Sequence, residues 1–355
     1  MRNNLRLYHT MVGQIGKWLP SERITRVRNL ALFLTGLYLG RKVHLSLIAE
    51  EWHLPGKTPS LVNRLRRFLD NPRVSVGDYY RPVAESLVSA FRGVPIRLII
   101  DTTKLGFNAR LLMVSIGYRK RALPLAWSVH RGKKGWVAVK QQVALLRQVA
   151  ELIPEESEVW LLGDCEFQHV PLLSWLEKQG WHYVLRQQGR VQVWQPGRTQ
   201  VSLTSLGLKE GETRYLGWVR LAAKYHYGPV SMVLHWEEGE DEPWYLVTDQ
   251  AATARTIQTY RLRMWIEELY GDMKGHGFDL EATYMRDPDR LSRLVLGVCL
   301  VYVWLISLGC WVVVYGKRLL VDGEVRRVVG CFGIGWSWLS RCLALGLALD
   351  LRFLR

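Results

Sequence analysis

The sequence predicts an α/β protein: a mixed β-sheet core, preceded by a helical domain and interrupted by a β-rich insertion. Residues 1–92 carry apolar residues mostly at helical spacing. Residues 93–180 alternate short apolar runs with one amphipathic helix, and two of these runs end in an aspartate. Residues 181–250 contain short strand-like runs between Gly, Pro, Thr and acidic clusters. Helical periodicity returns in residues 251–355, which we expect to complete the core and add C-terminal helices.

The composition is that of a globular, basic protein. Its 355 residues are 48% hydrophobic and 23% charged, with a formal net charge of +16. Residues 1–95 hold 15 Lys or Arg against 6 Asp or Glu, so more than half of the surplus lies in about a quarter of the chain. Such a surplus favours an acidic polymer or an anionic membrane as the partner. Composition alone leaves open a basic protein with no such partner.

Cysteine usage and the N-terminus bear on the compartment. The five cysteines form no CxxC pair and have no His at zinc-ligand spacing, so we expect neither structural zinc nor a disulfide framework. The first residues contain no continuous apolar run, so we expect no signal peptide. Both expectations fit a cytoplasmic protein, which would associate with the nucleoid if it binds DNA.

One segment could cross a membrane. Leu294 to Gly316 is uncharged for 23 residues, which is long enough to span a bilayer as a helix. The alternative is a fully buried core helix. We favour the core helix and expect no membrane partner, because the chain has one such segment and it follows a helix rich in acidic and basic residues.

The N-terminal domain contains a pattern typical of a helix-turn-helix. A helix over 44–54, a turn over 55–59 and a second helix over 60–71 are predicted. A helix that enters the major groove needs polar and basic side chains for phosphates and base edges. The second helix offers Asn63, Arg64, Arg66 and Arg67. An ordinary solvated helix face is the alternative to DNA contact.

The core shows a β-β-β-α-β order. Strands are predicted over 96–101 and 158–164, and two more within 110–130 are joined by a basic turn. An amphipathic helix is predicted over 137–153. A further helix over 165–180 is expected to start near Phe167. This order resembles the ribonuclease-H-like core, a mixed sheet with helices on both faces.

Asp101 and Asp164 each end an apolar strand. Strand-end acids lie side by side when their strands are neighbours, and a third acid on a packed helix would complete a cluster. Mg²⁺ and Mn²⁺ prefer carboxylate oxygens, and two such ions can activate an attacking oxygen and stabilise a leaving one in phosphodiester chemistry. A helix cap or turn acid is the alternative for each aspartate taken alone.

The segment YRLRMWIEELYGDMK supplies the third acid. Tyr260, Arg263, Glu267 and Lys274 are 3, 4 and 7 residues apart, so a continuous helix keeps them near one face. A carboxylate flanked by a phenol, a guanidinium and an ammonium suits a scissile phosphate, because the cations neutralise phosphate charge. An exposed helix with ion pairs is the alternative interpretation.

The spacing Y-(2)-R-(3)-E-(6)-K resembles the signature of the insertion-sequence DDE transposases that cut DNA through a hairpin intermediate. Tyr260, Arg263, Glu267 and Lys274 match it without a gap. DTT at 101–103 looks like that family's first-aspartate motif. DCEF at 164–167, followed by HYVLR at 182–186, is similar to its second-aspartate region. The resemblance covers about residues 95 to 315.

The resemblance implies roles for these residues. Asp101, Asp164 and Glu267 would be the catalytic metal ligands, for two Mg²⁺ ions that Mn²⁺ can replace, with Thr103 close to the site. Tyr260, Arg263 and Lys274 would contact phosphates of the transposon end. A tryptophan of the insertion would stack on a flipped base, and our candidates are Trp236 and Trp244, for which packing in a small sheet is the alternative.

The expected function is therefore a cut-and-paste DNA transposase. Its partners would be double-stranded DNA, namely terminal inverted repeats and target DNA, and a second copy in a synaptic homodimer. The chain ends 81 residues after Lys274, which leaves little room for the separate C-terminal dimerisation domain of some relatives. A catalytically idle DNA-binding protein derived from a transposase is the alternative function.

Overall fold

The computed structural model describes residues 3–52, 57–132, 137–222, 224–323 and 329–349. The α-helices in these ranges are α1 (Asn3–Trp18), α2 (Ile24–Gly40), α3 (Leu45–Glu50), α4 (Thr58–Asp70), α5 (Val76–Ser89), α6 (Val139–Ala150), α7 (Val170–Lys178), α8 (Ala254–Arg261), α9 (Trp265–Met273), α10 (Pro288–Val314) and α11 (Cys331–Ala344). The strands are β1 (Ile96–Leu105), β2 (Ala109–Tyr118), β3 (Arg121–Arg131), β4 (Val159–Gly163), β5 (His182–Gln187), β6 (Gln192–Trp194), β7 (Val201–Ser202), β8 (Thr213–Leu221), β9 (Tyr227–His235) and β10 (Trp244–Thr248).

The strands form one mixed sheet in the order β3-β2-β1-β4-β5-β10-β9-β8-β6-β7. The β1–β4 and β4–β5 pairs are parallel, and the other pairs are antiparallel. This confirms a mixed α/β fold. The strands of residues 181–250 continue the core sheet without a break, because β10 pairs with β5.

The β2–β3 connection shows how the sequence sets up the sheet. Arg119 and Lys120 both have positive φ, at 48° and 65°, as a two-residue hairpin turn between right-twisted strands requires. Pairing through Tyr118 and Arg121 closes the hairpin directly at this turn. The basic residues expected to join two strands over 110–130 therefore form the turn itself.

The predicted helix over 165–180 begins later than expected. Cys165–Phe167 forms a single 3₁₀ turn, η1, and α7 starts at Val170 with a proline in its first turn. Asp164 is the N-cap of η1. A short polar turn thus follows the acid at the end of β4, and the strand ends by presenting Asp164.

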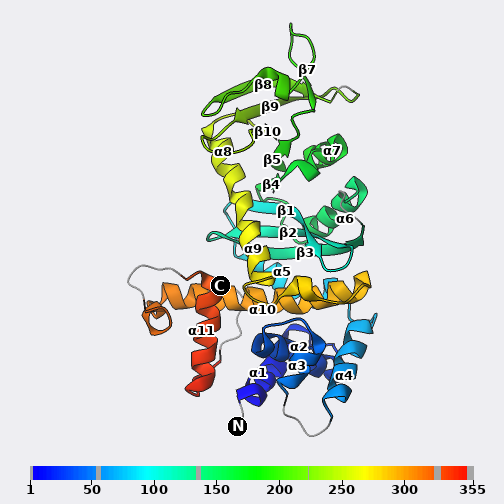
Figure 1. Ribbon diagram of the computed structural model, residues 1–355, viewed down its shortest axis with the longest axis vertical. Coiled ribbons are helices and arrows are strands. Elements are labelled where there is room, and N and C mark those ends of the chain that lie inside the picture. The colour runs from blue at the N-terminus through cyan, green and yellow to red at the C-terminus, as the bar shows by residue number, and fades with distance from the viewer. Residues whose placement is uncertain (1–2, 53–56, 133–136, 223, 324–328, 350–355) are drawn as a thin grey trace.

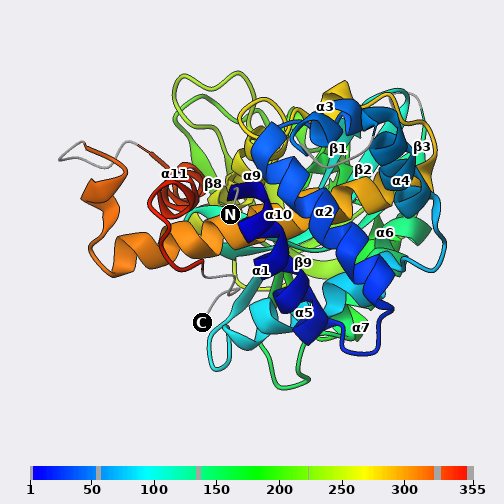
Figure 2. The same cartoon turned by 90° about the horizontal axis from the view of Figure 1, so that it is seen from below.

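The N-terminal helices pack below the sheet, and α10 runs between the two (Figures 1 and 2). Buried Arg293 of α10 donates from Nε to the Val74 carbonyl and from Nη1 to the Leu69 carbonyl, both at 3.0 Å. On the sheet side, the Tyr80 hydroxyl of α5 donates to the Pro124 carbonyl of β3 at 2.8 Å. The N-terminal helices and the sheet therefore share a contact surface. The domain boundary predicted at residue 92 stays a prediction.

The long apolar segment is packed as a core helix. Among the described residues, α10 alone is long and apolar enough to cross a membrane, and 83% of its most apolar window is buried inside the protein. Helix α11 crosses it closely: a Cβ on Gly309 would lie 1.8 Å from the Cys331 carbonyl oxygen. Glycine is required there because the two backbones touch.

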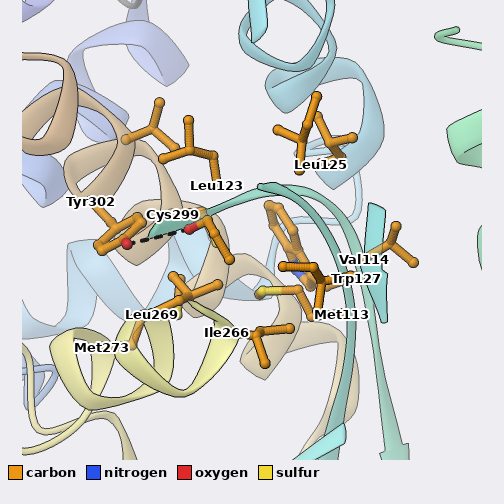
Figure 3. Packing of buried hydrophobic residues seen from close by; sticks show 14 of the residues in the cluster. Met113, Val114, Leu123, Leu125, Trp127, Ile266, Leu269, Met273, Cys299 and Tyr302 are labelled. Atoms are coloured by element: carbon orange, nitrogen blue, oxygen red, sulfur yellow. Dashed lines mark hydrogen bonds between the residues drawn. The ribbon is translucent and has the colours of Figure 1, made fainter. Parts of the chain in front are cut away.

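Helix α9 is anchored by its apolar face. Ile266, Leu269 and Met273 point into a cluster formed with Met113 of β2, Leu123 of β3, and Cys299 and Tyr302 of α10 (Figure 3). All seven side chains are buried. This packing fixes the rotation of α9 and leaves Glu267, on another side of the helix, exposed.

Candidate active site

The register of β1 against β4 brings two acids together. The parallel ladder runs from Ile96↔Val159 to Ile100↔Gly163. Asp101 is the next residue of β1, and Asp164 directly follows the end of β4. We had expected Asp101 to end its strand. Instead, β1 continues to Leu105 and pairs there with β2 alone. Beyond residue 100, β1 therefore has an open edge next to Asp164.

The surroundings of Asp101 disfavour the ionised form of its carboxyl. Its side chain is nearly buried, with the residue 7% exposed. Burial raises the pKa of this carboxyl to about 7, and the neighbouring charges of Asp164 and Glu267 act in the same direction. The Arg263 guanidinium and the Thr102 amide, which donates to Asp101 Oδ1 at 2.9 Å, lower the pKa in part.

Arg263 links the first acid to the third. Its Nη1 lies 3.6 Å from Asp101 Oδ2, and its Nη2 lies 3.5 Å from Glu267 Oε1. The Arg263 side chain is 13% exposed and that of Glu267 is 51% exposed. Glu267 is thus a solvent-facing carboxylate joined to buried Asp101 through one guanidinium.

The helix that carries this segment is not continuous. Leu262–Met264 forms a 3₁₀ turn, η3, between α8 and α9. The expectation of one uninterrupted helical face is therefore wrong. Tyr260 lies before the turn and Glu267 after it, and Arg263 in the turn carries the guanidinium that reaches both acids.

Lys274 approaches the site at the other end of α9. It is the C-cap residue, and its Nζ donates to Thr103 Oγ1 at 2.7 Å and pairs with Glu281 Oε1 at 2.7 Å. The buried Tyr270 hydroxyl donates to the Asp101 carbonyl at 3.1 Å. Helix α9 is therefore tied to β1 at two points, the Asp101 carbonyl and the Thr103 hydroxyl.

Tyr260 is more buried than we expected for a residue in direct contact with a phosphate. It is 2% exposed, and burial raises the pKa of its phenol to about 12. Its ring packs edge-on against Trp244 of β10, with centroids 5.0 Å apart. Its electrostatic neighbours are Arg263, Arg186, Cys165 and Asp164, so its hydroxyl lies at the edge of the acidic site.

The two candidate tryptophans of the insertion are partly buried. The Trp236 indole donates to the Glu240 carbonyl at 2.8 Å, and Trp244 packs on Tyr260. Sequence reasoning missed Trp218 of β8, which is 74% exposed with φ of 56° and lies within the register shift between Leu216 and Val219. A stacking role for Trp236 or Trp244 stays a prediction.

Glu166 was also missed. It is buried next to the site, where its Oε1 accepts from the Val137 amide at 2.7 Å and from Thr102 Oγ1 at 3.1 Å. Burial raises the pKa of its carboxyl. The second acid of DCEF was the signal that could have revealed it. Glu166 holds the segment after β4 against β1 and thereby positions Asp164.

The second helix of the predicted helix-turn-helix is present as α4, and its contact with DNA stays a prediction. It begins at Thr58, two residues earlier than expected, and α3 ends at Glu50. The expected turn falls partly outside the described residues, because 53–56 are not described. The four polar side chains of α4 named above are all exposed: Asn63, Arg64, Arg66 and Arg67.

The three carboxylates suit a divalent cation, although the Arg263 guanidinium lies between those of Asp101 and Glu267. Within the described ranges no three His, Cys, Asp or Glu side chains are gathered closely enough to hold a metal. Asp101 nevertheless interacts electrostatically with both Asp164 and Glu267, and its charge is poorly compensated. Three carboxylates in this state are the ligand chemistry that Mg²⁺ and Mn²⁺ prefer.

Comparison with known families identifies the chain. A family model described as a transposase DDE domain matches residues 110–304, more than half of the chain. The chain belongs to the DDE transposase family. The matched range contains Asp164 and Glu267 and begins shortly after Asp101. Transposases of this family generally use divalent metal ions.

Other comparisons add little to this assignment. No curated protein matches the transposase. Among solved structures, a cryo-EM structure of a piggyBac transposase synaptic complex with hairpin DNA is similar at 10% identity and a TM-score of 0.47, over 99% of this chain and 86% of that one. At that level of similarity, the assignment rests on the domain match.

Proposed function

We propose that this transposase cuts an insertion element out at its terminal inverted repeats and joins it to target DNA. The observation that carries the proposal is the convergence of Asp101 and Asp164 at one sheet edge, with Arg263 linking Asp101 to Glu267. We assign the sheet order β3-β2-β1-β4-β5, with β1, β4 and β5 parallel, to a ribonuclease-H-like core.

Asp101, Asp164 and Glu267 are the residues that would hold two Mg²⁺ ions, which Mn²⁺ can replace. Such ions activate an attacking oxygen and stabilise a leaving oxygen in phosphodiester cleavage and strand transfer. Asp101 must be ionised to serve as a ligand, and a bound cation would favour the ionised form that burial disfavours.

The cations of the site would position DNA. Arg263 presents a guanidinium whose Nε is buried without a hydrogen-bond partner, and Lys274 presents an ammonium at the hydroxyl of Thr103. Both are suited to phosphates on either side of a scissile bond. Tyr260 is buried, and it would support the site indirectly because its ring packs against Trp244 and its hydroxyl interacts with Arg263. Exposed Asn63, Arg64, Arg66 and Arg67 of α4 would bind the repeat.

The Y-(2)-R-(3)-E-(6)-K spacing supports the finer features of this function. They are a hairpin intermediate at the cut end and a homodimer that holds both ends of the element. We further propose that the protein acts at the nucleoid without a membrane partner, because its substrate would be DNA. The burial of α10 within the protein is consistent with this last proposal.

A cleavage assay tests the proposal. Inverted repeats taken from the genomic flanks of the gene are supplied as labelled duplexes in Mg²⁺. Glu267→Gln should lower cleavage by more than about 100-fold, because even loss of a group that only supports a metal ligand costs about 10–100-fold. Glu268→Gln is the matched control, since Glu268 is also exposed on α9 but pairs with Arg121.

The alternative is a catalytically idle DNA-binding protein. It predicts that the unaltered protein binds the repeat but cuts it in neither Mg²⁺ nor Mn²⁺. The presence of all three acids favours the active enzyme. Equal cleavage by Glu267→Gln and the unaltered protein would refute the assignment of Glu267.

A further inference from the structure

Two aromatic rings stand exposed at the far end of β1, the strand that carries Asp101. Phe107 lies in the β1–β2 hairpin turn and is 51% exposed, and Tyr284 lies between the 3₁₀ turn η4 (Leu280–Ala282) and α10 and is 75% exposed. Their ring centroids are 6.2 Å apart, with 32° between the ring planes. We call Phe107 and Tyr284 the aromatic platform.

The backbone beneath the platform is closely packed. Gly106 has φ of 48°, and a Cβ there would lie 2.9 Å from the Thr283 carbonyl oxygen. The flanking Leu105, Leu280 and Thr283 are all buried. The two rings are thus held outward by a tight junction between the hairpin and the η4 loop. Exposing two large rings on a rigid base costs hydrophobic burial, which suggests a ligand that covers them.

Positive charge accompanies the rings. The Arg286 guanidinium lies 5.2 Å from the Phe107 ring centroid, and the His44 ring lies 5.3 Å from that of Tyr284. An aromatic surface with a neighbouring guanidinium favours nucleobases, which stack on rings, next to phosphates, which pair with cations. A purely apolar partner would gain nothing from Arg286.

The platform is continuous with the active site. Strand β1 leads from Asp101 to Leu105 and then to Phe107, while Lys274 bridges Thr103 of β1 and Glu281 of η4. A strand rises about 3.3 Å per residue, so Asp101 and Leu105 are about 13 Å apart. In B-form DNA that length corresponds to about four nucleotide steps.

We propose that the aromatic platform binds unpaired nucleotides of the strand that runs past the active site. This inference rests on the proposed function, because it takes the strand cut at Asp101 as its starting point. Stacking between protein rings and bases is sequence-tolerant, so the platform holds the strand without reading it. The platform is distinct from the insertion, where the exposed rings among the described residues include Tyr215, Trp218 and Tyr225.

The test measures binding of the full chain without divalent metal, so that catalysis plays no part. The probes are a labelled blunt duplex and the same duplex with a single-stranded thymidine extension. Tyr284→Ala and Phe107→Ala should each weaken binding of the extended duplex about tenfold and leave the blunt duplex unchanged. Tyr284→Trp should retain binding, since it keeps an aromatic face.

Tyr315→Ala is the control, because Tyr315 is 64% exposed at the far end of α10. Equal binding by the platform variants and the unaltered protein would overturn the proposal, as would equal losses on both duplexes. A protein partner at this surface, such as a second copy, would appear as a change in oligomeric state with no selective loss on the extended duplex, and would also overturn it. Failure of the proposed function has a separate signature, namely no cleavage by the unaltered protein in Mg²⁺.

Discussion

Replacing Asp101 with asparagine is expected to stabilise the transposase at pH 8 while it removes cleavage. The carboxyl is buried, and its pKa is about 7 in the folded protein against an ordinary value of 3.8. Each pKa unit corresponds to 1.36 kcal/mol, so keeping this group ionised in the folded state costs about 4 kcal/mol. Asparagine has nearly the same shape and carries no charge.

The sign of the pH dependence follows from the raised pKa. Below pH 3.8 the carboxyl is protonated in both folded and unfolded chains, and the substitution should change little. Between pH 4 and 7 the unfolded chain releases the proton while the folded one keeps it, so the stability of the unaltered protein falls as pH rises. Above pH 7 the cost is complete. The gain from Asp101→Asn should therefore increase from near zero at pH 4 to about 4 kcal/mol at pH 8.

Urea unfolding in EDTA at pH 5 and pH 8 measures this difference. Glu267→Gln is the control, and because Glu267 is half exposed its effect should stay within about 0.5 kcal/mol. Addition of Mg²⁺ should then stabilise the unaltered protein more than Asp101→Asn, since only a ligand-bearing folded state gains from the ion. An equal effect of Asp101→Asn at both pH values, or a loss of stability at pH 8, would refute the reasoning.

Three further predictions concern the fold. Asp272 is buried, and burial raises the pKa of its carboxyl to about 6 despite Arg121. Asp272→Asn should therefore stabilise the protein by about 3 kcal/mol at pH 8 and not at pH 4, as urea unfolding at both pH values will show. Gly335→Ala should lower the melting temperature, because its Cβ would lie 1.9 Å from the Leu305 carbonyl oxygen, whereas Gly13→Ala meets no atom within 4 Å and should not. Arg293→Met should cost about 3 kcal/mol in urea unfolding, because it leaves two buried carbonyls without their donor; no loss would show that water replaces the guanidinium.

Much of the core could be predicted because its patterns are local. Apolar runs ending in an acid predicted β1 and β4, with Asp101 on β1 and Asp164 directly after β4. The basic turn between β2 and β3 was also evident, since Arg119 and Lys120 separate two apolar runs. Helices dominate the N-terminal residues as their periodicity predicts.

Features that depend on distant pairing could not be predicted. The continuation of β1 past Asp101 depends on β2, and the joining of the insertion to the core depends on β10 meeting β5. The 3₁₀ turn at 262–264 has no Pro or Gly to indicate it. The exposure of Trp218 follows from register shifts in β8, and a period-two pattern carries no sign of such shifts.

The site combines a rigid scaffold with three carboxylates whose negative charge is only partly balanced. Ile266, Leu269 and Met273 hold α9 against the sheet, and the Tyr270 and Lys274 bonds tie it to β1. Within this frame a single guanidinium, Arg263, serves acids on β1 and α9 at distances of 3.6 and 3.5 Å, longer than a close ion pair. Burial raises the pKa of Asp101, and the negative charges of Asp164 and Glu267 add to this effect beyond what the one guanidinium offsets. The fold thus stabilises the positions of the acids through apolar packing, and under the proposed function divalent cations would compensate their negative charge at the time of reaction.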